Sequence, residues 1–321
     1  MPEQSRSANG VVVLGAGRGL ASVLRALGGM KRPLTVVVSI AYEGERGDEP
    51  EQRLKGEGVG DLRHSLEALS REPGPLLRAL RRPLTIERLG RHPLGNLAIA
   101  SAAAALGDYG QASLWLGEQL GIEAAVLPAT TEPVRREIER VPRSAPGQPT
   151  GGPGPPLRML RFVGDSIESP RPAIVAIKRA RWALLAPGDL YRGVLATAAV
   201  PDIAAALRGT SASVVWIANL EAEPDEPADL TAMDHLELLR SHGVRVDTVL
   251  HDPSAALKCD PAELERRGVE LVSRPFRSTE GRATHDPNQL RSALAALIEP
   301  VPTWGPASDR EAGRSGPTRR H

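Results

Sequence analysis

This chain contains little cysteine and has no excess of charge of one sign. Cys259 is its only cysteine, which excludes an intramolecular disulfide framework, and no second thiol or metal-ligand spacing stands near it. The 40 basic and 39 acidic side chains leave a net charge of +1, and no segment concentrates positive charge as a nucleic-acid groove requires. We therefore expect neither a disulfide scaffold nor nucleic-acid binding.

Long apolar segments are missing as well. No run approaches the roughly 20 residues that a membrane-spanning helix needs, and the opening MPEQSRSANG lacks the cationic and apolar regions of a secretory signal. The chain also has no Walker phosphate loop, no GxSxG motif and no HExxH motif. These absences predict a cytoplasmic protein that makes no contact with a membrane.

The pattern that is present is an alternation of strands and helices. The β-branched run Val11–Leu14 is typical of a buried strand; the glycine turn GAGRG and the helical spacing of LASVLRAL follow it, and a second strand is predicted at Leu34–Ile40. Such a β-α-β opening implies a parallel sheet. Further strands are predicted at Ala124–Leu127, Trp182–Ala186, Ser213–Ala218 and Val246–Leu250, and helices at Leu94–Leu106, Pro201–Leu207 and Met233–Ser241. The sequence therefore predicts an α/β fold with a doubly wound, mostly parallel sheet and helices on both faces, a Rossmann-like three-layer sandwich.

The composition divides the chain into one main domain and two polar ends. The segment 141–156 is so rich in proline and glycine that we expect a surface loop or linker there. Residues 1–9 and 301–321 contain few apolar side chains, and we expect them to be disordered. A single domain over residues 10–300 follows.

The first candidate site is the turn after the first strand. Glycines at 15, 17 and 19 let the backbone approach a ligand, and the free amides and positive end of the following helix attract phosphate. The third glycine falls one residue early for the dinucleotide fingerprint, so a standard NAD pocket is not expected. The sequence favours phosphate binding over a plain tight turn.

Two polar segments follow the second strand. In GVGDLRHSL, Asp61 has the position of a helix N-cap, and Arg63 could direct its guanidinium at a phosphate or carboxylate. His92 and Asn96 precede a helix of small residues, where such a pair usually caps the helix. Local structure alone explains all four residues without a ligand.

The later candidates lie after predicted strands. Pro187, Gly188 and Asp189 form a turn at the carboxyl end of a strand, where open α/β sheets hold ligands. Asn219 follows the next strand. Asp234 and His235 are adjacent in a helix and face different directions, so N-capping by Asp234 is the simpler interpretation. His285 is expected in a loop before a last helix.

In their order, these segments resemble the YvcK/CofD family over residues 11–287. The family's GGGTG turn is matched by Gly15–Gly19, its PPGDLRN by Gly60–Arg63, and its GHxxGN by His92, Gly95 and Asn96. Its VLPAT is matched by Val126–Thr130, and its LGPGSLYTSVLP by Pro187, Gly188, Leu190 and Tyr191. A later asparagine is matched by Asn219, and a DH pair by Asp234 and His235. The predicted ligand-binding residues are Gly15, Gly17, Arg18, Gly19, Asp61, Arg63, His92, Asn96, Pro187, Gly188, Asp189, Tyr191, Asn219, Asp234 and His235.

The resemblance implies a phosphorylated small-molecule ligand and a homodimer. In the YvcK branch, which this chain resembles more closely, the ligand is a UDP-sugar such as UDP-N-acetylglucosamine, and the role is in gluconeogenic growth and cell-wall metabolism. The CofD branch, 2-phospho-L-lactate transferase, instead transfers a phosphorus-containing group with magnesium.

This chain departs from the family pattern at several positions. Ala41 and Tyr42 replace two acidic residues after the second strand, so a hard cation would lose oxygen ligands. Arg18 lies in the first turn, where it would either add a contact or block the site, and Asp189 replaces a serine and would repel a phosphate unless an arginine such as Arg192 offsets it. We therefore expect no resident magnesium and binding rather than catalysis. A nucleotide-sugar-binding regulator is favoured; a magnesium-dependent transferase and a paralogue that only contacts other proteins remain alternatives.

Overall fold

The computed structural model of the chain describes residues 10–43, 57–70, 74–86, 90–141, 157–164, 166–221, 223, 230–279 and 284–298. The predicted ends 1–9 and 301–321 lie outside these residues. So does the proline-rich segment 141–156 except for Val141, which ends a strand.

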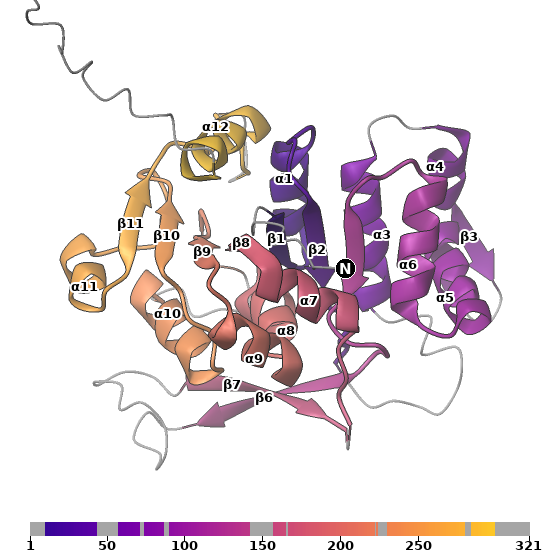
Figure 1. Cartoon of the computed structure of the whole chain (residues 1–321), viewed down its shortest axis with the longest axis horizontal. Coiled ribbons are helices and arrows are strands. Elements are labelled where there is room, and N and C mark those ends of the chain that lie inside the picture. Colours follow the sequence, from indigo (N-terminus) through magenta and orange to yellow (C-terminus); the bar gives the residue numbers. More distant parts are fainter. Residues whose placement is uncertain are drawn as a thin grey trace, which may run out of the picture.

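A seven-stranded parallel sheet forms the centre of the described part of the chain, and its strand order is β11-β10-β9-β8-β1-β2-β5. From left to right, Figure 1 shows β11, β10, β9, β8, β1 and β2 in that order. The strands are β1 (Gly10–Gly15), β2 (Leu34–Val38), β5 (Ala125–Pro128), β8 (Ala180–Leu185), β9 (Ser213–Ile217), β10 (Thr248–His251) and β11 (Glu270–Ser273). This confirms the predicted doubly wound α/β fold. The strand β11 was not predicted, and Ser39 and Ile40 lie beyond the end of β2.

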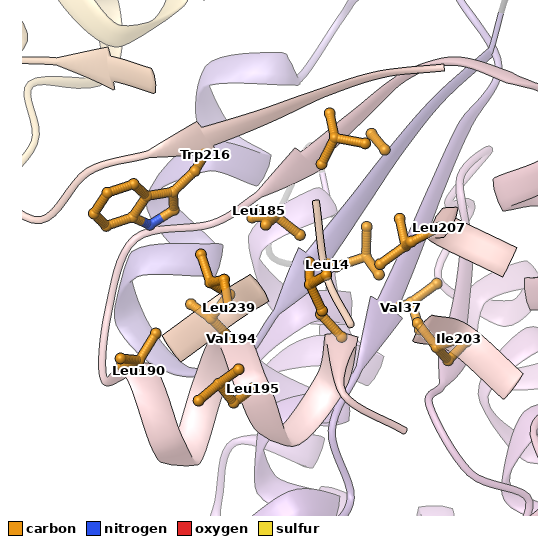
Figure 2. Packing of buried hydrophobic residues seen from close by; sticks show 14 of the residues in the cluster. Leu14, Val37, Leu185, Leu190, Val194, Leu195, Ile203, Leu207, Trp216 and Leu239 are labelled. Carbon is orange, nitrogen blue, oxygen red and sulfur yellow. The ribbon is translucent and has the colours of Figure 1, made fainter. Parts of the chain in front are cut away.

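The central strands bury side chains on both faces, as strands of a parallel sheet do. Val12 and Leu14 of β1 belong to one hydrophobic cluster, while Val11 and Val13 belong to the other. The first cluster includes α7 (Arg171–Arg179), η1 (Leu190–Val194), α8 (Leu195–Ala198), α9 (Pro201–Gly209), α10 (Ala232–Ser241) and α11 (Pro261–Arg266). The second includes α1 (Gly17–Leu27), α3 (Glu57–Leu69), α4 (Pro75–Leu80), α5 (Leu94–Leu106), α6 (Tyr109–Gln119) and α12 (Pro287–Ile298). Figure 2 shows the first cluster, in which Leu14, Val37 and Leu185 from the strands pack near Leu195, Ile203 and Leu207.

Two antiparallel ribbons accompany the sheet. One pairs β3 (Pro83–Ile86) with β4 (Gly90–Pro93), and the other pairs β6 (Arg135–Val141) with β7 (Leu157–Val163). His242, at the end of α10, joins the second ribbon to the sheet layer, because its Nε2 accepts the Leu160 amide at 2.9 Å. Burial lowers the pKa of His242, because it disfavours the charged ring. The sequence did not predict either ribbon.

The connections place a topological switch point between β1 and β8. From β1 the chain adds β2 and β5 in one direction; it then returns to β8, on the other side of β1, and continues to β9, β10 and β11. In such sheets ligands bind in the crevice beyond the carboxyl ends of the strands at the switch point. The first glycine turn, residues 15–19, follows β1, and the second, residues 187–189, follows β8, so both lie at this point.

No single helix in the described ranges is long and apolar enough to cross a membrane. The bent pair Leu190–Ala198 and Pro201–Gly209 reaches the combined length and hydropathy. Its apolar side chains, such as Leu195, Ile203 and Leu207, are buried in the cluster of Figure 2.

Candidate functional site

Two glycine turns meet at the switch point because glycines let their backbones approach closely. A Cβ on Gly15 would lie 2.9 Å from the Cβ of Ala186, and a Cβ on Gly19 would lie 1.9 Å from the carbonyl oxygen of Pro187. The Thr197 hydroxyl adds a hydrogen bond to the Gly15 carbonyl at 3.2 Å. Gly15 and Gly19 are therefore required by packing, whatever ligand the site holds.

The first turn, residues 15–19, leaves backbone amides available. Gly17 has φ +72°, and apart from its chain neighbours and the nearby backbone of α1 no described heavy atom lies within 4 Å of an added Cβ. Helix α1 begins at Gly17 after Ala16, whose side chain cannot cap it, and the amides of Arg18 and Gly19 have no acceptor among the described residues. The Arg18 side chain is exposed. These features are those of an anion-binding helix N-terminus.

Side chains accept backbone amides in and just after the second turn, residues 187–189. The Asp189 carboxylate accepts the amides of Tyr191 at 2.8 Å and Arg192 at 2.7 Å, as the N-cap of η1. Asn219 accepts the Gly188 amide at 2.7 Å and donates to the Gly188 carbonyl at 2.9 Å. The predicted turn into a helix is confirmed, but the amides of Gly188, Tyr191 and Arg192 already have acceptors.

Asp61 reaches the first turn from the interior of a helix. The prediction that Asp61 is an N-cap is wrong, because α3 begins at Glu57. The reason is packing: a Cβ on Gly58 would lie 2.1 Å from the Cα of Ile40, so this glycine lets the first turn of α3 pack against the segment after β2. The Asp61 carboxylate accepts the Gly17 amide at 3.2 Å and so links α3 to the first turn.

Arg63 and Asn96 form a buried pair beside this helix. Arg63 Nε donates to Asn96 Oδ1 at 2.9 Å, and Arg63 also pairs with Glu67. The predicted capping role of His92 and Asn96 is wrong: His92 lies in β4, and Pro93 precedes α5 without a side-chain cap. Asn96 instead orients Arg63, and no hydrogen bond or ion pair among the described residues joins His92 to either glycine turn.

Asp234 and His235 have structural roles at the start of α10. The N-cap is Thr231, not Asp234 as predicted, and Asp234 completes a capping box by accepting the Thr231 amide at 2.9 Å. His235 is buried, its ring stacks on Trp216 with centroids 5.4 Å apart, and its Nδ1 lies 2.9 Å from the Thr231 carbonyl oxygen. His235 therefore packs against one face of the sheet.

The sequence did not single out a charged group at the carboxyl end of β2. Glu43 Oε1 lies 3.2 Å from Nε of Arg136 and 3.5 Å from Nε of Arg192. Arg136 also donates from Nη1 to the Ala41 carbonyl at 3.0 Å. Only the presence of Arg192 after the second turn could have signalled this group.

Asp252, just after β10, is a second group that the sequence did not reveal. It is buried and accepts the amides of Phe276 at 2.5 Å and Arg277 at 2.7 Å. Burial alone would raise the pKa of Asp252, but these bonds and those from Ser254 outweigh burial and lower the pKa. Burial also lowers the pKa of His285 to about 4, against the charge of Asp252. His285 lies in the predicted loop before α12, and Asp252 fastens that region to the sheet.

A cleft of about 850 Å³ lies at the opposite edge of the sheet, where β2 begins. Residues of the loop after α1, including Gly29, and the side chain of Arg291 line it. Arg291 donates to the carbonyls of Ala26 at 3.1 Å and Arg25 at 3.2 Å, so it caps the C-terminal end of α1. Gly29, at this edge, is therefore far from the glycine turns along α1.

Comparisons with known proteins identify a family and support the fold. The family model described as "2-phospho-L-lactate transferase CofD" matches residues 11–277. A putative gluconeogenesis factor of Mycobacterium tuberculosis is 31% identical over 89% of this chain and 89% of its own length. One from Deinococcus radiodurans is 30% identical over 91% of this chain, which spans 66% of that relative. A crystal structure of a UPF0052 family protein from Bacillus halodurans has a TM-score of 0.75 at 24% identity, covering 89% of this chain and 98% of that one; it supports the fold.

Proposed function

The chain belongs to the 2-phospho-L-lactate transferase CofD family, and on that basis we propose that it binds a phosphorylated nucleotide ligand, a UDP-sugar such as UDP-N-acetylglucosamine, at the first glycine turn. The binding regulates central carbon or cell-wall metabolism. Similarity to proteins named gluconeogenesis factor supports the metabolic role. The choice of a UDP-sugar follows from the resemblance of the sequence motifs to the YvcK branch.

The availability of the first turn carries the proposal. The amides of Arg18 and Gly19 lack acceptors among the described residues, and the positive end of α1 lies behind them. An added Cβ at Gly17 meets nothing within 4 Å of the described atoms, so a phosphate has room to approach these amides. Asp61 accepts the neighbouring Gly17 amide, which leaves the other two for the ligand.

Magnesium-dependent group transfer fits the residues after β2 less well. Ala41 contributes no oxygen from its side chain, Tyr42 contributes a neutral phenol, and the Glu43 carboxylate is held by two guanidinium groups. The described residues contain no group of three or more His, Cys, Asp or Glu side chains that could hold a metal ion. This set of donors does not suit a hard cation, which prefers several carboxylate oxygens. We therefore favour binding over magnesium-dependent transfer.

Thermal unfolding with and without UDP-N-acetylglucosamine tests the proposal. A ligand that binds only the folded state raises the Tm by mass action. Gly17→Ala places a methyl group where the phosphate would lie and should abolish the rise. Gly29→Ala is the matched control: Gly29 has φ +86° and equally open surroundings, but it lies beyond the other end of α1. Both variants carry similar backbone strain.

The experiment compares substitutions at the two ends of α1. The proposal requires a ligand-induced rise in the wild type and in Gly29→Ala, and none in Gly17→Ala. It fails if UDP-N-acetylglucosamine and other UDP-sugars leave the wild-type Tm unchanged at concentrations far above physiological ones. It also fails if Gly17→Ala responds as fully as Gly29→Ala.

A further inference from the structure

Two arginines converge on one carboxylate oxygen at the carboxyl end of β2. The Nε atoms of Arg136 and Arg192 lie 3.2 and 3.5 Å from the same atom, Oε1 of Glu43. The three residues are distant in sequence: Glu43 follows β2, Arg136 belongs to β6, and Arg192 belongs to η1. Three separate elements thus bring two positive charges to one point on the edge that carries the glycine turns.

Arg136 is held rigidly in this position. Its side chain is 2% exposed, and its Nη1 donates to the Ala41 carbonyl at 3.0 Å. Backbone bonds fix its strand to the segment after β2: the Tyr42 amide donates to the Val134 carbonyl at 2.9 Å, and the Arg136 amide donates to the Tyr42 carbonyl at 2.8 Å. A guanidinium this deeply buried is costly without an anion beside it. A negative charge beside Arg136, from the chain or from a ligand, therefore stabilises the folded protein.

Arg192 connects this position to the first glycine turn. It precedes Gly193, where an added Cβ would lie 3.7 Å from the backbone nitrogen and oxygen of Ala16. The start of η1 thus packs directly against the first turn. The Arg192 side chain is 45% exposed and that of Glu43 is 36% exposed, so both can be reached from solvent and can reorient.

We propose that Arg136 and Arg192 form the subsite for the second phosphate of a diphosphate-linked ligand, and that Glu43 occupies this subsite until the ligand displaces it. The inference rests on the proposed function and extends it, because the first phosphate lies on the amides of Arg18 and Gly19. Phosphate oxygens form the same charge-assisted bonds to guanidinium groups as the Glu43 carboxylate does. Glu43 then competes with the ligand and sets its affinity.

This arrangement distinguishes diphosphates from monophosphates. UMP can use only the amides of the first turn, whereas UDP and UDP-sugars also reach the arginines. Removing the competing carboxylate should tighten binding of diphosphates, and removing Arg192 should weaken it. Neither change should alter UMP binding to a similar extent.

Calorimetric titrations of UDP, UMP and inorganic pyrophosphate test the subsite in four variants. Glu43→Gln should bind UDP and pyrophosphate about fivefold more tightly. Arg192→Gln should bind UDP roughly tenfold more weakly, with UMP changed less than about twofold. Glu139→Gln and Arg161→Gln are the controls, because they break an exposed Glu–Arg pair of the β6–β7 ribbon, 3.1 Å apart, without touching the site; both should bind as the wild type does.

The inference is overturned if Glu43→Gln binds UDP no more tightly than the wild type, or if Arg192→Gln weakens UDP and UMP equally. It is also overturned if neither the wild type nor Glu43→Gln binds pyrophosphate. Failure of the proposed function looks different, since UDP-sugars then fail to bind the wild type at all. If Gly17→Ala abolishes binding while Glu43→Gln and Arg192→Gln have no effect, the proposed function stands and the subsite does not.

Discussion

The first turn, residues 15–19, and the second turn, residues 187–189, follow neighbouring strands, but their backbone amides differ in what accepts them. In the second turn Asp189 and Asn219 accept them. In the first, Ala16 offers no cap, Asp61 accepts the Gly17 amide, and the amides of Arg18 and Gly19 have no acceptor among the described residues. Glycine content alone therefore does not identify a phosphate site; the residue at the N-cap decides whether the amides are available.

The largest effect should come from the contact between the two turns. In Gly19→Ala the new Cβ would lie 1.9 Å from the Pro187 carbonyl oxygen, so backbone must shift and the free energy of unfolding should fall by about 3 kcal/mol or more. Urea unfolding measures it. Gly60→Ala is the control, since its nearest neighbour is Asn96 Nδ2 at 3.8 Å and alanine favours a helix by roughly 0.5–1 kcal/mol. Equal stability of the two variants would show that the turns are not in contact.

Much of this geometry could be predicted from the sequence, and the limits have physical causes. The run Val11–Leu14 and the glycines after it specify strand, turn and helix locally, so the β1–α1 unit was predicted, although α1 begins three residues before the predicted Leu20. The start of α3 was misplaced because tertiary packing of Gly58 on Ile40 overrides the low helix propensity of glycine.

Long-range side-chain partners lay beyond prediction. Arg136 and Glu43 are 93 residues apart and meet through a ribbon whose pairing has no local signal. The acceptors of the second turn were equally hidden, because the sequence does not show that Asn219 bonds both backbone groups of Gly188. Asp189 was expected to face a phosphate, whereas it caps η1. A single sequence predicts helices and strands better than it predicts the side-chain contacts between them.

The next largest effect should come from the residue that closes the second turn. Asn219→Ala leaves the amide and carbonyl of Gly188 without their partner in a buried setting, and the free energy of unfolding should fall by about 2–3 kcal/mol. Asn288→Ala, at an exposed position of α12, should change it by less than about 0.5 kcal/mol. Chemical denaturation gives both values. A loss no greater than that of Asn288→Ala would mean that Asn219 does not hold this turn.

A smaller effect is expected at the N-cap of η1. Asp189→Ala should cost about 1–2 kcal/mol, the usual value for a lost cap. UDP-N-acetylglucosamine should still stabilise the variant, because the first turn is untouched. Asp260→Ala removes an equivalent cap from α11, where Asp260 accepts the amides of Ala262 and Glu263, and should cost a similar amount. If Asp189→Ala lost ligand binding while Asp260→Ala kept it, the second turn and not the first would be the phosphate site.

The most direct test of the central claim follows backbone amide chemical shifts during titration with UDP-N-acetylglucosamine. The amides of Arg18 and Gly19, which lack acceptors among the described residues, should move strongly as a phosphate binds them. Those of Gly188 and Tyr191, which donate to Asn219 and Asp189, should stay near their starting positions. Large shifts at Gly188 and Tyr191 with none at Arg18 and Gly19 would contradict this account.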